Sequence, residues 1–139
     1  MRVLYTGGTF DLFHYGHMHF LKQCNRLASR VVVSLNTDEF IESYKGKPPV
    51  LSYKEREESI KLSNLAFDVV PNTGGADSKP AILSVKPDIV CIGDDWAKKD
   101  YYKQMSFTQE WLDEQKILLC YIPYHKGIST TEIKRRLNG

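Results

Sequence analysis

Short apolar runs rich in Val, Ile and Leu alternate along the chain with segments whose apolar residues recur every three or four positions. The runs are typical of buried strands, and the longer segments are typical of helices. We predict strands over residues 2–6, 30–36, 67–71, 87–92 and 117–122, and helices over residues 15–27, 52–65, 79–85 and 102–115. This alternation indicates parallel strands joined by helical crossovers. The expected fold class is α/β, a single doubly wound domain with a parallel sheet over residues 1–139.

Two helix starts are marked by a Ser that is followed three residues later by a Glu. Ser52 and Glu55 begin the helix predicted to residue 65, and Ser129 and Glu132 begin a last helix near the C-terminus. In this arrangement the Ser accepts from the third amide while the Glu bonds back to the Ser amide. Three polar or glycine-rich segments, 7–17, 93–96 and 123–131, follow predicted strands. Rossmann-like sheets bind their ligands at such strand ends.

The composition narrows the classes of protein to which this chain can belong. Its 139 residues carry 19 basic and 17 acidic side chains, a net charge of +2, which leaves no basic footprint for nucleic acid. No apolar run has the length of a membrane-spanning helix, and the N-terminus lacks the apolar region of a signal peptide. Cys24, Cys91 and Cys120 are odd in number and widely spaced, which suits free core thiols in a reducing compartment. We therefore expect a cytoplasmic protein without nucleic-acid or membrane partners.

The segment from Gly7 to His17 places glycines, a helix start and two histidines directly after the first strand. Glycines let backbone amides approach a phosphate, and a helix N-terminus adds partial positive charge. His14 and His17 are three residues apart, so both imidazoles project from one face of the first turn and can donate to phosphate oxygens. The alternatives are a tight turn whose histidines bind nothing and a zinc site completed by His19. At about 100° per residue His19 points roughly 200° away from His17, so we expect no metal site.

Two motifs carry a resemblance to a known family. Gly8-Thr9-Phe10-Asp11, followed by His14-Tyr15-Gly16-His17, resembles the signature of the H-x-G-H nucleotidyltransferases, and Gly127-Ile128-Ser129-Thr130-Thr131 resembles their second signature. With residues 36–40 and 93–96, the similarity to the glycerol-3-phosphate cytidylyltransferase family extends over nearly the whole chain. The resemblance implies an enzyme that transfers CMP from CTP to a small phosphorylated alcohol, first of all glycerol 3-phosphate, giving CDP-glycerol and pyrophosphate.

The resemblance also implies a role for each matching residue. The implied catalytic residues are His14, His17, Lys45 and Lys47. The implied nucleotide-binding residues are Gly8, Thr9, Phe10, Gly16, Arg56, Asp94, Asp95, Trp96, Gly127, Ile128, Ser129, Thr130 and Thr131. The implied acceptor-binding residues are Asp11, Asp38 and Lys45. Mg²⁺ on the leaving phosphates and a homodimer belong to the same expectation.

Ordinary alternatives stand beside the roles of the basic residues. Lys45 and Lys47 lie in a predicted loop over residues 44–50, where lysines are usually solvated. Arg56, early in a predicted helix, is expected at the surface, where it can pair with Ser52 or Glu55. These two interpretations need no ligand.

Other predicted site residues also have alternatives at strand and helix ends. Ser129 can offer an amide and a hydroxyl to an anion, but a plain capped helix has the same pattern. Asp94 and Asp95 can form a turn or accept from the nucleoside, with Trp96 as an aromatic wall. Asp38 is expected to cap a helix.

One position departs from the cytidylyltransferase pattern. The family usually has Arg three residues before the glycine of its second signature, and this chain has Tyr124, followed by His125 and Lys126. Lysine is a point charge and does not replace the bidentate fork of arginine. The sister family of heptose-phosphate adenylyltransferases also lacks this Arg. An adenylyltransferase that acts on a sugar phosphate therefore stays open as an alternative, as does a nucleotide-binding domain without turnover.

Overall fold

The computed structural model describes residues 2–93, 105–122 and 135–137. These described residues form a sheet of five strands in the order β3-β2-β1-β4-β5. The strands are β1 Val3–Gly8, β2 Arg30–Leu35, β3 Asp68–Pro71, β4 Ile89–Gly93 and β5 Leu118–Ile122. Every neighbouring pair is parallel. From the central β1, the chain adds β2 and β3 on one side and then β4 and β5 on the other.

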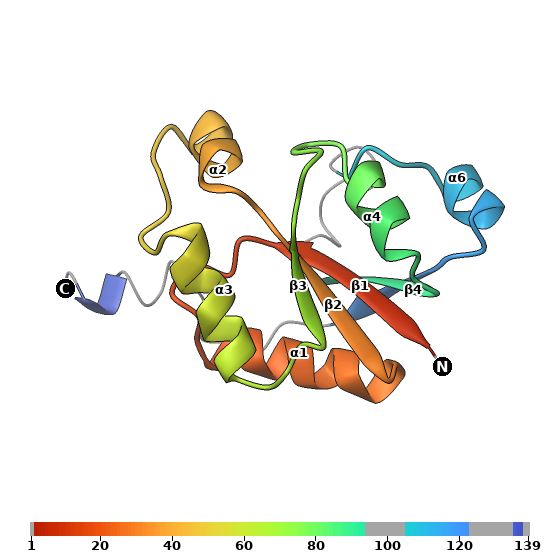
Figure 1. The fold of residues 1–139 in the computed structure, drawn as a ribbon, viewed down its shortest axis with the longest axis horizontal. Coiled ribbons are helices and arrows are strands. Elements are labelled where there is room, and N and C mark those ends of the chain that lie inside the picture. Colours follow the sequence, from red (N-terminus) through yellow and green to blue (C-terminus); the bar gives the residue numbers. More distant parts are fainter. Residues whose placement is uncertain (1, 94–104, 123–134, 138–139) are drawn as a thin grey trace.

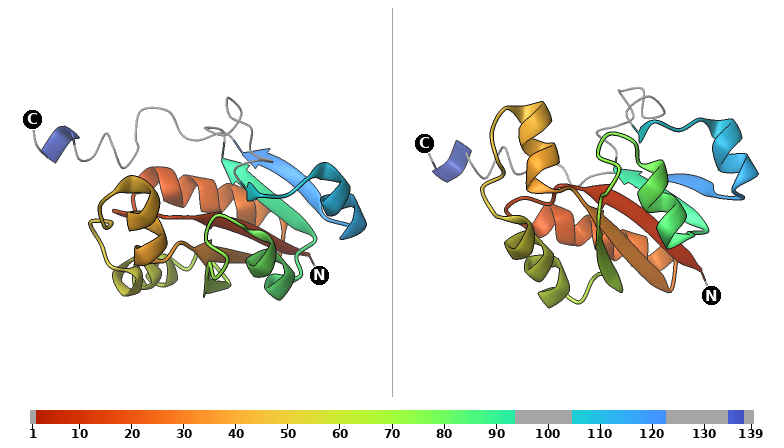
Figure 2. Two further views of the ribbon diagram at one scale, coloured as in Figure 1. Left: turned by 90° about the horizontal axis from the view of Figure 1, so that it is seen from above. Right: turned by 45° about the horizontal axis from the view of Figure 1, so that its top comes forward.

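Helices cover both faces of this sheet (Figure 1). They are α1 Tyr15–Leu27, α2 Asp38–Lys45, α3 Tyr53–Leu62, α4 Lys79–Val85 and α6 Gln109–Glu114. One core cluster joins α1 and α3 to the sheet, and a second joins α4 and α6 to the opposite face. The two layers of helices are also visible in the turned views of Figure 2. The predicted doubly wound, Rossmann-like α/β fold is thus confirmed.

The strands at the centre of the sheet are apolar on both faces because both faces are covered. Along β1, Leu4 packs in the α1 cluster and its neighbour Tyr5 in the α4 cluster. Along β4, Cys91 and Val90 divide in the same way. Continuous apolar runs are the pattern that two-sided burial requires, and this explains why the strands were predictable from composition.

The helix boundaries differ from the predictions where local capping decides them. Residues 38–45 form α2, for which the sequence predicted a start at Asp38 but no extent, and Lys45 is its last residue and not part of a loop. Thr37, not Asp38, is the cap, and its side chain accepts from the Phe40 amide at 3.2 Å. Gly46 ends the helix at φ 78°, a conformation that glycine adopts without steric cost.

Two further helices are shorter than predicted. The helix α3 ends at Leu62 and not at residue 65, and Asn64 just beyond it has φ 59°. The helix α6 begins at Gln109, because the Thr108 side chain caps it by accepting from the Trp111 amide at 3.1 Å. Residues 135–137 are helical, but the start predicted for that helix at Ser129 lies outside the described residues.

All three cysteines are free thiols, as predicted. Cys24 is fully buried on α1, Cys91 is 2% exposed on β4, and Cys120 lies opposite Cys91 on β5. A hydrogen bond with Cys91, together with burial, raises the pKa of the Cys24 thiol far above its ordinary value. Such a thiol stays protonated and acts as a small apolar core group.

In the part of the chain that the structure describes, no helix has both the length and the hydropathy that crossing a bilayer requires.

Replacing Cys24 with Ala tests its purely structural role. Deleting one fully buried heavy atom should lower the free energy of unfolding by about 1 kcal/mol, as small core deletions do. Urea unfolding measures this change, and the activity of the folded variant should match that of the wild type. Lost turnover at unchanged stability would assign the thiol to the chemistry instead.

Candidate active site

The two halves of the sheet part at the carboxyl ends of β1 and β4. These strands share only two residue pairs, Leu4↔Ile89 and Tyr5↔Val90. Each strand stays paired with its other neighbour to its end, at Gly8↔Leu35 and at Gly93↔Ile122. This is the position where the strand order reverses, and open α/β sheets bind ligands in the crevice at this position.

A pocket that is open to solvent occupies this crevice. Its floor comes from the ends of β1 and β4, and Thr9 and Phe10 continue it beyond β1. His17 and Phe20 of α1 and Met105 form further parts of the wall. Gly8 packs closely against Phe10, because a Cβ at this position would lie 2.9 Å from the Phe10 ring.

His14 and His17 cap α1 reciprocally. His14 is the N-cap residue, and its Nδ1 accepts from the Gly16 amide at 2.9 Å. His17 Nδ1 in turn accepts from the His14 amide at 3.2 Å. This is the geometry of a Ser–Glu capping box built from two imidazoles. Because each Nδ1 is an acceptor, each neutral ring carries its proton on Nε2 and presents an N–H donor there.

The surroundings of the two rings keep them neutral. The His14 and His17 rings stack with centroids 3.9 Å apart, and the Phe13 ring stacks with His17 at 5.6 Å. Burial, followed by the effect of His14, lowers the pKa of His17 to about 3, and burial also lowers the pKa of His14. His14 is only 9% exposed, and its buried Nε2 has no hydrogen-bond partner within the described residues. The site thus holds a neutral donor that is ready for an acceptor such as a phosphate oxygen.

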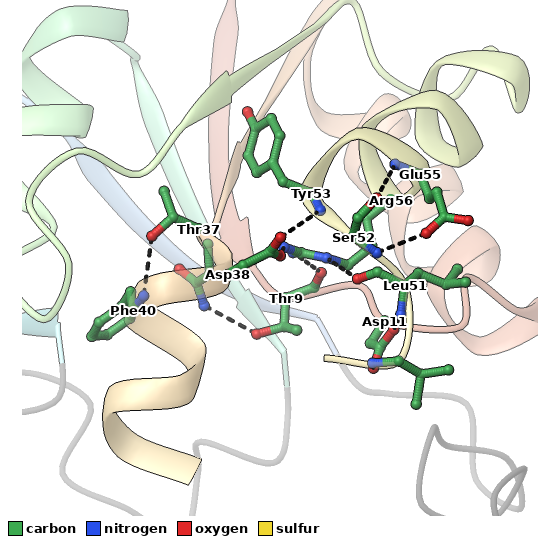
Figure 3. A network of polar contacts seen from close by, with 12 residues as sticks. Thr9, Asp11, Thr37, Asp38, Phe40, Leu51, Ser52, Tyr53, Glu55 and Arg56 are labelled. Atoms are coloured by element: carbon green, nitrogen blue, oxygen red, sulfur yellow. Dashed lines mark hydrogen bonds and ion pairs between the residues drawn. The ribbon is translucent and has the colours of Figure 1, made fainter. Parts of the chain in front are cut away.

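A network of polar contacts connects the turn after β1 with α2 and α3 (Figure 3). Its centre is Arg56 of α3, whose side chain is 0% exposed. Arg56 donates from Nε to the Leu51 carbonyl at 3.1 Å and from Nη1 to the Thr9 carbonyl at 2.9 Å. Its Nη2 donates to Asp38 Oδ1 at 2.7 Å, and Asp38 Oδ2 accepts from the Tyr53 amide at 3.3 Å.

Asp11 belongs to the same network and is 5% exposed. Its Oδ2 accepts from the Val50 amide at 2.7 Å. Its Oδ1 accepts from the amides of Leu51 at 2.9 Å and Leu12 at 3.0 Å. The carboxylate thus binds the end of the segment between α2 and α3 to the turn that leads to the histidines.

The sequence of this chain matches proteins of known family. The cytidylyltransferase-like family profile matches residues 5–136, which is most of the chain. The chain belongs to the cytidylyltransferase-like family. Enzymes of this family transfer nucleotidyl groups, so the protein is a nucleotidyltransferase, and the alternative of a binding domain without turnover is set aside.

Two curated relatives show the range of its similarity. The glycerol-3-phosphate cytidylyltransferase of Bacillus spizizenii (strain ATCC 23059 / NRRL B-14472 / W23) is 36% identical over 97% of this chain and 96% of its own length. The FAD synthase of Thermococcus kodakarensis (strain ATCC BAA-918 / JCM 12380 / KOD1) is 34% identical over 99% of this chain and 91% of its own length. Among solved structures, the lipopolysaccharide core biosynthesis protein of Thermoplasma volcanium GSS1 has a TM-score of 0.72 at 26% identity, covering 92% of this chain and 99% of that one.

The structure brings one group of the predicted site residues together at the crevice. Gly8, Thr9, Phe10 and His17 line the pocket. His14 stacks on His17, and Gly16 lies buried in the first turn of α1, where its amide donates to His14. No metal cluster accompanies them: within the described ranges, no three His, Cys, Asp or Glu side chains are placed to hold an ion.

The basic and acidic residues of the second group are arranged differently. Lys45 and Lys47 are exposed at and beyond the end of α2, outside the pocket lining. The expectation of a surface Arg56 is wrong, because its guanidinium is enclosed and bound to three protein oxygens. Asp11 and Asp38 also bind protein groups. Contacts of these five residues with a nucleotide or an acceptor stay predictions.

A third group lies outside the described residues. It comprises Asp94, Asp95, Trp96, Gly127, Ile128, Ser129, Thr130 and Thr131, together with the departing position Tyr124. The second anion site therefore stays a prediction as well.

Sequence reasoning missed part of the pocket wall. Phe20, Cys91 and Met105 line it although nothing was assigned to them, and Phe13 stacks on His17. Phe13 and Phe20 flank the motif histidines in the sequence, and this proximity was a usable signal. Met105 carries no such signal, because it is far from the motif in the sequence; it packs against the core cluster of α4 and α6, and the Ser78 hydroxyl donates to its carbonyl at 2.5 Å.

The pH dependence of stability tests the burial of His17. Between about pH 6.5 and pH 3 the unfolded chain binds a proton at His17 that the folded chain does not, so the free energy of unfolding falls as the pH falls. One such proton contributes at most about 1.4 kcal/mol per pH unit. Urea unfolding between about pH 5 and 6.5, above the carboxylate range, measures the slope.

The matched variant is His17→Asn, in which the amide oxygen keeps the acceptor for the His14 amide but does not titrate. Its slope should be shallower than that of the wild type, and a remainder due to His14 should persist, since the pKa of that ring is also lowered. Equal slopes in the two proteins would contradict a buried, neutral His17.

Proposed function

We propose that the enzyme transfers CMP from CTP to a small phosphorylated alcohol, foremost glycerol 3-phosphate, with release of pyrophosphate. The observation that carries the proposal is the pair of imidazoles that cap α1, each with its Nδ1 accepting from a backbone amide. His17 lines the crevice, and the buried Nε2 of the stacked His14 has no hydrogen-bond partner within the described residues. The nearly full-length similarity to a glycerol-3-phosphate cytidylyltransferase supports the choice of CTP and of this acceptor.

The reaction is a single displacement at the α-phosphorus of the nucleotide. A phosphate oxygen of the acceptor attacks the α-phosphorus, and the bond from that phosphorus to the bridging oxygen of the pyrophosphate breaks. The acceptor phosphate is already ionised at neutral pH, so no general base is required. Catalysis therefore consists of positioning and of stabilising the charge on the transferred phosphoryl group. We assign this stabilisation to Nε2–H donors of His14 and His17.

The leaving pyrophosphate needs cations and further donors. We propose Lys45, Lys47 and the predicted helix start at residues 129–131 for this task. Mg²⁺ on the leaving phosphates is part of the proposal, and it would arrive with the nucleotide, since the described residues hold no cluster of ligands for it. Homodimer assembly and a cytoplasmic location stay predictions from the family resemblance and the composition.

A second candidate is an adenylyltransferase that acts on another phosphorylated acceptor. Tyr124 in place of the family arginine favours it. So does the full-length similarity to a relative named FAD synthase, since FAD contains an adenylyl group. The two candidates share the same chemistry and differ in the base and in the acceptor.

A panel of substrates tests the proposal. Pyrophosphate release should be measured for each of the four nucleoside triphosphates with glycerol 3-phosphate, a sugar phosphate and flavin mononucleotide. CTP with glycerol 3-phosphate should give the highest kcat/KM. A preference for ATP would establish the second candidate, and no release in any pairing would overturn the proposal.

The roles of the histidines are tested by His14→Asn and His17→Asn, which keep an acceptor near the Nδ1 position and remove the Nε2–H. Each should lower kcat by about 10²–10⁴-fold with the best substrate pair, the range for losing a donor to developing charge. His19→Asn, on the same helix, is the matched control and should leave kcat unchanged. Near-normal turnover in both test variants would refute the mechanism.

A further inference from the structure

One buried cation joins three segments of the chain, of which the turn after β1 lines the crevice. The three nitrogens of the Arg56 guanidinium reach Thr9 in the turn after β1, Leu51 at the end of the α2–α3 segment and Asp38 at the start of α2 (Figure 3). Thr9 lies five residues before His14 in the sequence, and Asp38 begins the helix that ends at Lys45. A single side chain therefore connects the histidine turn, residues 9–14, to both ends of the segment 38–51, which carries Lys45 and Lys47.

The second connection runs through Asp11. Its two carboxylate oxygens hold the amides of Val50 and Leu51, while Arg56 holds the Leu51 carbonyl. Lys47 lies three residues before Val50, so its backbone cannot move more than about 10 Å from this anchor, at roughly 3.3–3.6 Å per residue. The exposed lysines are thus tethered at both sides, by α2 and by this anchor.

The geometry of Arg56 leaves it unsuited to hold a phosphate in this arrangement. Its side chain is 0% exposed, and all three of its nitrogens already donate to protein oxygens. Asp38 compensates its charge at 2.7 Å. The guanidinium directs its donors from three separate nitrogens in one plane, whereas a lysine ammonium has all its donors on a single nitrogen.

We infer that Arg56, with Asp38 and Asp11, is a positioning residue that sets Lys45 and Lys47 against the histidine turn, and that it does not itself bind the nucleotide. The inference rests on the proposed function, because it assigns the lysines to the triphosphate. On this inference, Arg56 affects catalysis by positioning the lysines and not by contacting a phosphate. The two possibilities differ in how the effect of an Arg56 substitution depends on the presence of Lys45 and Lys47.

A double-mutant cycle distinguishes them. Pyrophosphate release is measured for the wild type, Arg56→Lys, the pair Lys45→Met/Lys47→Met, and all three substitutions together. If Arg56 positions the lysines, Arg56→Lys lowers kcat/KM by about 10²-fold in the wild type, as a small misplacement can. It then has little further effect once the lysines are absent. The control cycle with Lys54→Met, an exposed cation on α3 outside the network, should be additive within about twofold.

Two results of this cycle overturn the inference. Equal losses from Arg56→Lys with and without the lysines would show that Arg56 acts independently of them, as a direct phosphate ligand does. Unchanged kcat/KM on removing both lysines would leave nothing for Arg56 to position. Thermal unfolding by circular dichroism verifies that each variant is folded, and Asp38→Asn takes the place of Arg56→Lys in the same cycle if that variant does not fold.

A measurement without substrate separates this inference from the proposed function. Hydrogen exchange of the ligand-free protein should be faster in residues 46–51 of Arg56→Lys than in the wild type, with α1 unchanged. Unchanged protection of residues 46–51 would contradict the tether. A wild-type protein that is inactive with every nucleotide but shows this exchange difference would refute the proposed function and leave the tether standing.

Discussion

The early end of the pairing between β1 and β4 is the constraint on which the site depends. The two strands share two residue pairs and then follow their outer neighbours. The backbone of Gly7 and Gly8 is thereby left open on the side of β4, and the first turn of α1 stands over the gap. In a doubly wound sheet this separation follows from the connectivity, because the chain leaves β1 in one direction and returns on its other side.

His14 and His17 cap α1 with neutral imidazoles, whereas a Ser–Glu capping box ends in a carboxylate. A reciprocal cap fixes both Nδ1 atoms as acceptors, and the rings of Phe13 and Phe10 pack against His17. The result is a pair of neutral N–H donors. Negative charge brought by a triphosphate would raise the pKa of both rings and strengthen these bonds as charge develops. Because the pKa of both rings is lowered, the free energy of unfolding falls at low pH.

The burial of Arg56 depends on the hydrogen bonds that its guanidinium makes. An ionised group taken out of water is strongly unfavourable unless it is paired and fully hydrogen-bonded, and here three oxygens meet that need. The same bonds join the turn after β1 to α2 and to residues 50–51. Asp11 is also buried, and its carboxylate accepts from the amides of Val50 and Leu51. These acidic and basic side chains therefore hold segments of the chain together through hydrogen bonds to backbone groups.

The sequence by itself determined the strands, the doubly wound fold, the free core thiols and the two histidines at the start of α1. Each of these depends on local periodicity or on residues close together in the chain. The sequence predicted a helix cap at Asp38 but not the extent of α2, whose Thr37 cap and Gly46 end enclose few apolar residues. The alternative of a surface Arg56 is wrong. Only the tertiary structure decided that Arg56 is enclosed and that Met105 and Cys91 line the crevice. Those facts depend on which distant segments pack together, and local spacing carries no record of such contacts.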